Sequence, residues 1–164
     1  MKLDTLLNIH GRLDLRQQEP QIQVKSVHSD SRDVQPGSVY VAIRGHSQDG
    51  HQFIQKAIDG GAVALVVEDI KSVPEDFPGA VLEVLHPRLS LQTLSPKFFG
   101  APGDRMTAVA ITGTNGKTSC TYILEHLLNE LQRPCGVIGT IDHHIGSQVW
   151  ETNLTTPDPI TLQK

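Results

Sequence analysis

The sequence predicts an α/β protein built from a small N-terminal α/β domain and the beginning of a second domain with a parallel sheet. Two observations predict this class. Apolar strand patterns alternate with helical patterns through the first 100 residues. A glycine-rich loop then stands between another predicted strand and helix. The segment "APGDRM", rich in Pro, Gly and charge, separates the two patterns, so we expect domains at 1–100 and 106–164.

In the first domain, runs of alternating or continuous apolar residues predict the strands, and residues at helical spacing predict the helices. The expected strands lie near 21–24 and at 39–43, 62–69 and 80–85. A short opening helix starts at Leu3 and ends near Gly11. A second helix follows "DGH" and is ended by Gly60 and Gly61, and a third begins at Pro87. Pro96 is expected to kink or end that third helix.

In the second domain, "TAVAITG" predicts a strand at 107–112 that is central to a parallel sheet. The following helix, 117–132, has apolar residues three and four apart on one face. These residues are Cys120, Ile123, Leu124, Leu127, Leu128 and Leu131. Another strand is expected in "CGVIGTI". The segment holds too few elements to complete a sheet, so we expect exposed apolar edges and a lower stability beyond about residue 101.

Composition excludes several classes of protein. The chain has 164 residues, is 38% hydrophobic and 20% charged, and carries a net charge of −4. These values are typical of a globular protein and give no basic surface for nucleic acid. No apolar run is long enough to span a bilayer, and the N-terminus lacks the apolar core of a signal peptide. We expect a cytoplasmic protein with neither nucleic-acid nor membrane partners.

The cysteines and histidines do not predict a metal site. Cys120 and Cys135 are expected to be free, buried thiols. The histidine-rich stretches "GHSQDGH" and "DHH" lack the spacing of a closed Cys/His site. We therefore expect His143 and His144 to lie in a solvated loop.

The stretch "TGTNGKT" carries the clearest chemistry. Gly113 and Gly116 allow backbone N–H groups to point at phosphate oxygens, and the helix that follows adds its positive end. Lys117 can reach the β- and γ-phosphates, and the Thr118 hydroxyl can ligate Mg²⁺. The loop thus predicts binding of a nucleoside triphosphate. By itself it leaves a kinase, a GTPase and an ATP-driven ligase open.

The loop is shorter than the general pattern, which would place a Gly at Ile111. It resembles the short loop of the Mur ligase family, the ATP-dependent enzymes that add amino acids to the peptidoglycan precursor. The resemblance implies catalytic roles for Lys117 and Thr118, with Thr118 as the Mg²⁺ ligand. It also implies that the ATP phosphates are held by Gly113, Thr114, Asn115, Gly116, Lys117, Thr118 and Ser119.

The segment from "SDSRDVQPGSVYVAIRGHSQDGH" to "VVED" resembles the UDP-recognising domain of the MurE and MurF members of this family. Thr114 in the loop and the later "NLTTPDPITLQ" favour the MurE group. The resemblance implies that the UDP precursor contacts Ser29, Ser31, His46, Ser47, Gln48, Thr155 and Thr156. Structural alternatives remain open at three places: Ser29, Asp30 and Ser31 as turn residues, Asp49 as a helix cap, and Thr156 as a cap with Pro157 opening a helix.

The resemblance further implies the reaction. ATP phosphorylates the D-glutamate carboxylate of UDP-MurNAc-L-Ala-D-Glu, and an amino acid, diaminopimelate or lysine, attacks the acyl phosphate. Full members of the family are much longer, so we expect an N-terminal part of such an enzyme that is inactive alone. The alternatives are a MurF-like or folylpolyglutamate-type ligase and a module that binds the precursor without catalysis.

Overall fold

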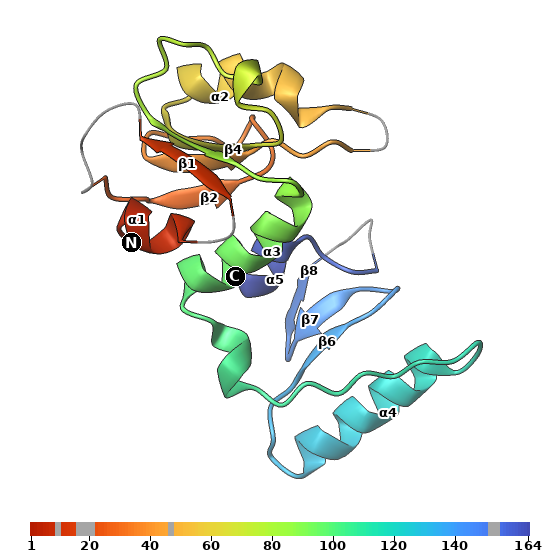
Figure 1. Cartoon of the computed structure of the whole chain (residues 1–164). Coiled ribbons are helices and arrows are strands. Elements are labelled where there is room, and N and C mark those ends of the chain that lie inside the picture. The colour runs from red at the N-terminus through yellow and green to blue at the C-terminus, as the bar shows by residue number, and fades with distance from the viewer. Residues whose placement is uncertain (9–10, 16–21, 46–47, 151–154) are drawn as a thin grey trace. The chain divides into compact units, whose positions relative to one another are not determined.

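The computed structural model describes residues 1–8, 11–15, 22–45, 48–150 and 155–164 (Figure 1). The chain divides into two compact units. The first is Met1–Arg105 with Gln163–Lys164, and the second is Met106–Leu162. Together they contain helices and a mainly parallel sheet, which confirms the predicted α/β class.

The described strands of the first unit form a five-stranded sheet in the order β1-β5-β4-β3-β2. The four strands β2 (Ser26–His28), β3 (Ser38–Val41), β4 (Ala62–Val67) and β5 (Ala80–Glu83) pair in parallel. β1 (Arg12–Leu15) pairs antiparallel with β5 at one edge. β3, β4 and β5 match three of the four strand patterns predicted for this domain. The strand expected near 21–24 is wrong in position, because the described residues there form only an isolated bridge between Lys2 and Gln23 and β2 begins at Ser26.

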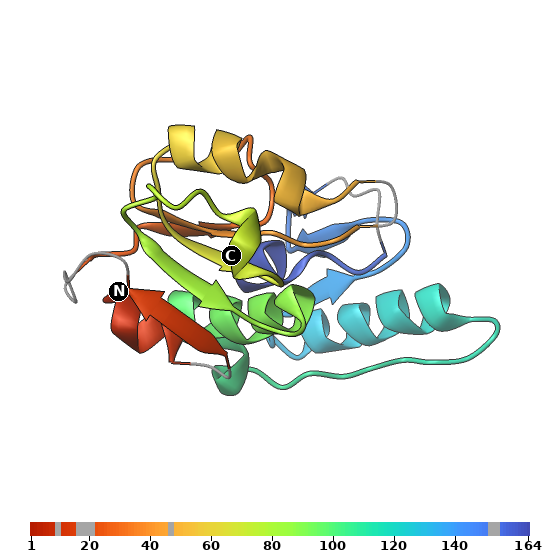
Figure 2. The same cartoon turned by 45° about the horizontal axis from the view of Figure 1, so that its top comes forward.

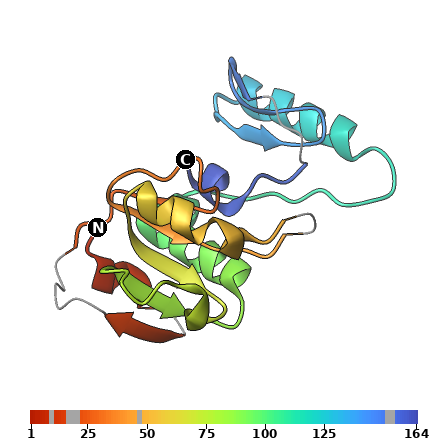
Figure 3. The same cartoon turned by 90° about the horizontal axis from the view of Figure 1, so that it is seen from above.

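Helices cover both faces of this sheet (Figures 1 and 2). α2 (Ile54–Asp59) lies over one face of the sheet (Figures 2 and 3). α1 (Leu3–Leu7) and α3 (Pro87–Phe99) pack against each other, with α3 against β2 and β3. Short 3-10 turns, η1 (Gly50–Phe53), η2 (Ile70–Ser72) and η3 (Pro102–Arg105), connect these elements.

The core follows from the burial of β4 on both faces. Successive side chains of a strand point to opposite faces, and both Leu65 and Val66 are fully buried. The cluster on the α2 side contains Tyr40, Leu65, Val67 and Phe77 among its members. A strand that is apolar at every position suits this environment, which is why its pattern in the sequence was continuous rather than alternating.

Two helix ends test the predictions made from Gly and Pro. α2 ends at Gly60, and Gly61 follows with φ +90°, where an added Cβ would lie 2.8 Å from the Cα of Pro36. The expectation that Pro96 would end α3 is wrong. The helix continues to Phe99 and ends at Gly100 in the left-handed conformation. A proline removes only one backbone hydrogen bond this near the helix end, so the last turn is retained.

The second unit contains α4 (Lys117–Glu130), α5 (Pro159–Gln163) and a three-stranded antiparallel sheet. Its strands β6 (Gly136–Ile138), β7 (His143–Ile145) and β8 (Gln148–Trp150) pair in sequence order. The predicted strand at 107–112 is wrong, because these residues lead to α4 as an unpaired segment. A parallel strand needs a neighbour in register, and the described strands of this unit pair with one another instead.

The predicted helix at 117–132 is confirmed as α4, but its apolar face is not buried. Ile123, Leu127 and Leu131 are 60%, 54% and 70% exposed. Among the described residues of this unit, the buried apolar side chains are Val137 and Ile160. The second unit therefore removes far less apolar surface from water than the first, in line with the expected exposed edges.

The buried strand β5 offers a direct test of the core. Replacing the fully buried Leu82 by alanine should lower the free energy of unfolding of the first unit by about 2–5 kcal/mol, because it leaves a cavity. Leu85→Ala is the matched control, since Leu85 is 87% exposed, and it should change stability by less than about 0.5 kcal/mol. Urea unfolding followed by circular dichroism measures both. Equal losses would contradict the described packing.

The two units should also differ in protection from hydrogen exchange. Backbone amides of β4, such as that of Val66, should exchange at least about tenfold more slowly than those of β7, because opening the second unit exposes less apolar surface. Exchange of the whole chain, read by mass spectrometry of peptides from both units, measures this. Equal protection of the two strands would contradict the expectation.

Candidate functional site

A cavity of about 450 Å³ opens at the carboxyl ends of β2 and β3. Both strands run in parallel, so the segments that follow them meet at one edge of the sheet. The volume of this cavity is in the range of small-molecule sites. The cavity is lined by Ser29, Asp30, Ser31, Arg32, Tyr40, Ile43, Gly45, Gln48, Gly50, Phe53 and Lys56.

The structure brings together three of the residues predicted to contact the UDP precursor. Ser29 and Ser31 follow β2, and Gln48 follows β3, yet all three line the same cavity. The Ser31 side chain is buried, whereas Gln48 is exposed. His46 and Ser47, predicted for the same contact, lie outside the described residues. The turn alternative also holds in part, because residues 29–32 form a bend and turn after β2.

Charged groups give the cavity a mixed polarity. The guanidinium of Arg32 shares its single Nε–H between the two carboxylate oxygens of Asp30, at 2.9 and 3.0 Å, and donates a second hydrogen bond to this carboxylate through Nη2. These bonds from Arg32 lower the pKa of Asp30 to about 2. Lys56, on α2, adds a second cation to the lining. Two cations beside one ionised carboxylate leave a net positive charge, which favours an anionic polar ligand.

The sequence did not predict the lining residues contributed by neighbouring elements. Tyr40 is buried with its hydroxyl donating to the Gly50 carbonyl at 2.9 Å, and burial raises its pKa to about 12. Phe53 and Lys56 come from η1 and α2. The available signal was topological: residues that directly follow two adjacent parallel strands converge, and the helix after the second strand borders them.

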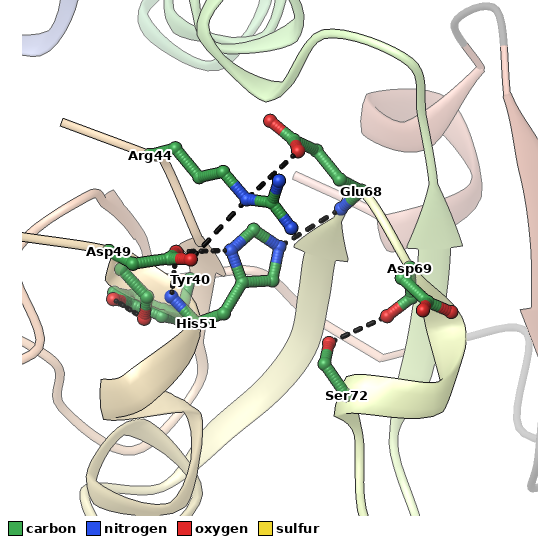
Figure 4. Close-up of polar contacts among 8 residues, drawn as sticks. Tyr40, Arg44, Asp49, His51, Glu68, Asp69 and Ser72 are labelled. Carbon is green, nitrogen blue, oxygen red and sulfur yellow. Dashed lines mark hydrogen bonds and ion pairs between the residues drawn. The ribbon is translucent and has the colours of Figure 1, made fainter.

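The loop after β3 is fixed by a network of polar contacts (Figure 4). Asp49 caps η1 by accepting the backbone N–H of His51 at 3.0 Å, which confirms its predicted capping role. The Nδ1 atom of His51 lies 2.7 Å from the same carboxylate. The Nε2 atom accepts the backbone N–H of Glu68 at 3.1 Å. Arg44 Nε lies 3.3 Å from Asp49 and 3.2 Å from Glu68.

The phosphate loop leads into the first turn of α4. Gly113 and Gly116 both have positive φ, at 147° and 79°, and Gly116 caps the helix. Helix geometry leaves the N–H groups of Lys117, Thr118 and Ser119 without partners four residues earlier in the helix, so they are available to an anion. The Lys117 ammonium donates to the carbonyls of Gly113 at 2.6 Å and Thr114 at 3.3 Å.

Thr155 and Thr156, the other predicted precursor contacts, are exposed and precede α5. The Thr155 carbonyl lies 3.3 Å from Nε2 of His143. The expectation that Thr156 caps the helix is wrong. Asp158 is the cap, accepting the N–H groups of Ile160 at 2.9 Å and Thr161 at 3.2 Å. A carboxylate accepts a more strongly charge-assisted bond than a hydroxyl, which explains the shift by two residues.

The expected solvated loop at His143 and His144 is wrong, because both side chains are buried in β7. His144 donates through Nδ1 to Asp142 at 2.6 Å and through Nε2 to Glu125, on α4, at 2.7 Å. The hydrogen bond to Asp142 raises the pKa of His144, and its second carboxylate partner acts in the same direction. The sequence did not predict this pairing because Glu125 is remote in the chain.

The two thiols differ from the expectation that both would be buried. Cys120 is exposed, and Cys135 is only partly buried. Cys120 lies on the first turns of α4, whose apolar face is open, so the helix does not cover it. In the part of the chain that the structure describes, no group of three or more His, Cys, Asp or Glu side chains could hold a metal ion.

Two family models match the chain, one for each region with a candidate site. The model described as the Mur ligase family, catalytic domain, matches residues 23–95, and the Mur ligase middle domain matches residues 111–164. The chain belongs to the Mur ligase family. The resemblance drawn from the phosphate loop and the "DSR" segment is thus confirmed at the level of the family.

Curated relatives within this family cover the chain well but extend beyond it. A UDP-N-acetylmuramoyl-L-alanyl-D-glutamate--2,6-diaminopimelate ligase of Bacillus velezensis is 40% identical over 141 residues, which are 86% of this Mur ligase chain and 28% of the relative. The ligase of the same name from Bacillus licheniformis is 35% identical over 164 residues, covering 100% of this chain and 33% of the relative. The chain therefore spans about a third of the length of these relatives.

Solved structures agree on the fold of this Mur ligase chain. A UDP-N-acetylmuramoyl-L-alanyl-D-glutamate--2,6-diaminopimelate ligase matches with a TM-score of 0.68 over 99% of this chain and 32% of that one, at 23% identity. MurF from Acinetobacter baumannii matches with a TM-score of 0.60 over 79% of this chain and 28% of that one, at 27% identity. Among the described residues, no helix has the length and apolar character needed to cross a membrane.

The His144 contacts predict a pH dependence for the second unit. A histidine with a raised pKa in the folded state contributes stability that is complete below about pH 6.5 and is lost as the pH rises through its folded-state pKa. The urea midpoint reported by Trp150, the single tryptophan, should be higher at pH 6 than at pH 8.5.

Two variants isolate the contribution of His144. In His144→Gln the difference between the two pH values should shrink, because glutamine does not titrate. His126→Gln is the control, since His126 is exposed on the same helix as Glu125, and it should keep the difference of the unmodified chain. An undiminished difference in His144→Gln would contradict the assignment.

Proposed function

We propose that this chain carries the precursor-binding domain and the ATP phosphate loop of a MurE-type ligase of peptidoglycan precursor synthesis in the cytoplasm. Residues 1–100 would bind UDP-MurNAc-L-Ala-D-Glu, and residues 106–164 would begin the ATP-binding domain. One observation carries the proposal: Ser29, Ser31 and Gln48 line a single cavity of about 450 Å³. The cationic side chains of Arg32 and Lys56 line the same cavity. A nucleoside diphosphate linked to a sugar is an anionic polar ligand of the kind this cavity favours.

The proposed reaction has two steps. The D-glutamate carboxylate attacks the γ-phosphorus of ATP, the bond to the bridging oxygen breaks, and ADP leaves. The amine of the incoming amino acid then attacks the acyl phosphate, loses a proton and expels inorganic phosphate, so an amide bond forms. We propose diaminopimelate as this amino acid, since the names of the relatives from both Bacillus species specify it.

The phosphate loop would stabilise the charge that develops during phosphoryl transfer. The N–H groups of Lys117, Thr118 and Ser119 sit at the positive end of α4, and Gly113 and Gly116 open the loop toward a phosphate. Lys117 would exchange its two carbonyl partners for phosphate oxygens. Thr118, in the first turn of the helix, fits a Mg²⁺ ligand, and this ion would neutralise charge on the β- and γ-phosphates.

Two other functions stay in contention. A MurF-like ligase is supported by the fold match to MurF of Acinetobacter baumannii at 27% identity. A module that binds the precursor without catalysis is supported by the segment 107–112, which is not a strand and so leaves the phosphate loop without the strand that the sequence pattern predicted before it. The acceptor amino acid separates the first alternative from the proposal. Binding without any nucleotide turnover is the mark of the second.

Calorimetric titration of the chain with UDP-MurNAc-L-Ala-D-Glu tests the cavity. Binding is expected without ATP, because the lining residues all belong to the first unit. Ser31→Ala should weaken it about fivefold to tenfold by removing a buried hydroxyl from the lining. Ser72→Ala is the control, since Ser72 is exposed and lies outside the cavity lining. Absence of binding by the unmodified chain would contradict the precursor site.

A separate titration with Mg-ATP tests the phosphate loop. Lys117→Met should weaken binding roughly 10- to 100-fold, because it removes a cation that contacts the phosphates. Lys71→Met is the matched control, since Lys71 is an exposed cation on η2 of the first unit, and it should leave ATP binding unchanged. Equal affinities for the two variants would show that the loop does not use Lys117.

A further inference from the structure

His51 is the best-buried member of the polar network beside the cavity, with a side chain only 9% exposed. It does not line the cavity, so a direct contact with the ligand does not explain its position. We propose that His51 is a positioning residue for the precursor site: its neutral imidazole clips the loop after β3 to the end of β4 and thereby holds one wall of the cavity. This inference rests on the proposed function.

The hydrogen bonds define the form of the imidazole. The backbone N–H of Glu68 donates to Nε2 at 3.1 Å, so this nitrogen must carry a lone pair rather than a proton. The proton of the neutral ring therefore lies on Nδ1, which donates to the carboxylate of Asp49 at 2.7 Å. With one nitrogen accepting and the other donating, His51 connects two segments that are far apart in the sequence.

Asp49 transmits this connection to the loop. Its carboxylate also accepts the backbone N–H of His51 at 3.0 Å, and this bond is the main cause of the lowered pKa of Asp49. Arg44 lies across the loop, bridged to Asp49 through the backbone, and its Nε atom is 3.3 Å from Asp49 and 3.2 Å from Glu68. Two contacts thus join the loop to the end of β4: the ion pair of Arg44 with Glu68, and the hydrogen bond from the Glu68 N–H to the His51 imidazole (Figure 4).

The clip borders the cavity directly through Gly50. The Gly50 N–H donates to the Ile43 carbonyl at 2.9 Å, and the Gly50 carbonyl accepts the Tyr40 hydroxyl at 2.9 Å. An added Cβ on Gly50 would lie 2.7 Å from the Ile43 nitrogen, so the two backbones are in close contact. Gly50, Ile43 and Tyr40 all line the cavity. Asp49 and His51, on either side of Gly50, therefore form the hydrogen bonds of the clip, and Gly50 itself lines the cavity.

Substitutions of His51 separate its two hydrogen bonds. Glutamine places an acceptor near the position of Nε2 and can keep the bond from Glu68, while the backbone N–H of residue 51 still donates to Asp49. Asparagine places a donor near the position of Nδ1 and can keep the bond to Asp49, but it is too short to reach Glu68. Alanine removes both. His86→Ala is the matched control, since His86 is exposed and outside the cavity lining.

The binding experiment uses the full 164-residue chain and UDP-MurNAc-L-Ala-D-Glu, with Mg-ATP titrated separately as a measure of the second unit. We expect at least tenfold weaker precursor binding for His51→Ala and His51→Asn, recovery to within about threefold for His51→Gln, and unchanged ATP binding in every variant. His86→Ala should bind the precursor like the unmodified chain. Precursor binding by His51→Ala within threefold of the unmodified chain would overturn the inference alone.

Absence of precursor binding by the unmodified chain would overturn the proposed function and the inference with it. A second measurement requires no variant and therefore does not depend on whether substitutions at this buried position fold. Nitrogen NMR of the histidine rings should show His51 with a protonated Nδ1 and an unprotonated, hydrogen-bonded Nε2 at neutral pH. A ring protonated on Nε2 would overturn the inference, because that nitrogen could not accept the Glu68 N–H.

Discussion

The parallel pairing of β4 with β3 and β5 is the constraint on which the first unit depends. Because β4 is buried on both faces, its register fixes where the neighbouring strands end and therefore where the loops after them meet. The cavity lies beyond the ends of β2 and β3, and the His51 clip reaches to Glu68, directly after β4. The candidate precursor site is therefore supported by three adjacent strands, although only two of them supply loops to its lining.

Sequence patterns predicted the first unit well because each pattern there reflects a local cause. Continuous apolar character marked β4, Gly60 and Gly61 ended α2, and Asp49 capped the turn that follows it. Ser29, Ser31 and Gln48 were named from a resemblance, and the structure places all three at one cavity. Tyr40 and Lys56 were missed, because their place at the cavity depends on packing between elements and leaves no mark in the local pattern.

The second unit shows where local patterns are insufficient. Residues 107–112 have the composition of a buried strand, but a strand exists only when another strand pairs with it, and the described strands of this unit pair in a separate antiparallel sheet. For His144 the error was the reverse, because the polar sequence around it predicted exposure to solvent. The ring is instead buried, since two carboxylates, one of them on α4, accept its hydrogen bonds. In both cases the deciding partner is distant in sequence, so no window of neighbouring residues contains the information.

The antiparallel edge strand β1 has a consequence for how the first unit forms. Arg12 pairs with Glu83, so β1 lies beside β5 in the sheet. In the sequence, however, β2, β3 and β4 all lie between these two strands. Closing so long a loop costs more entropy than bringing β3 and β4 together, which are joined by one short helix. We therefore expect the order of folding to run from the centre of the sheet outward, with β1 docking last onto an edge that the finished core presents to it.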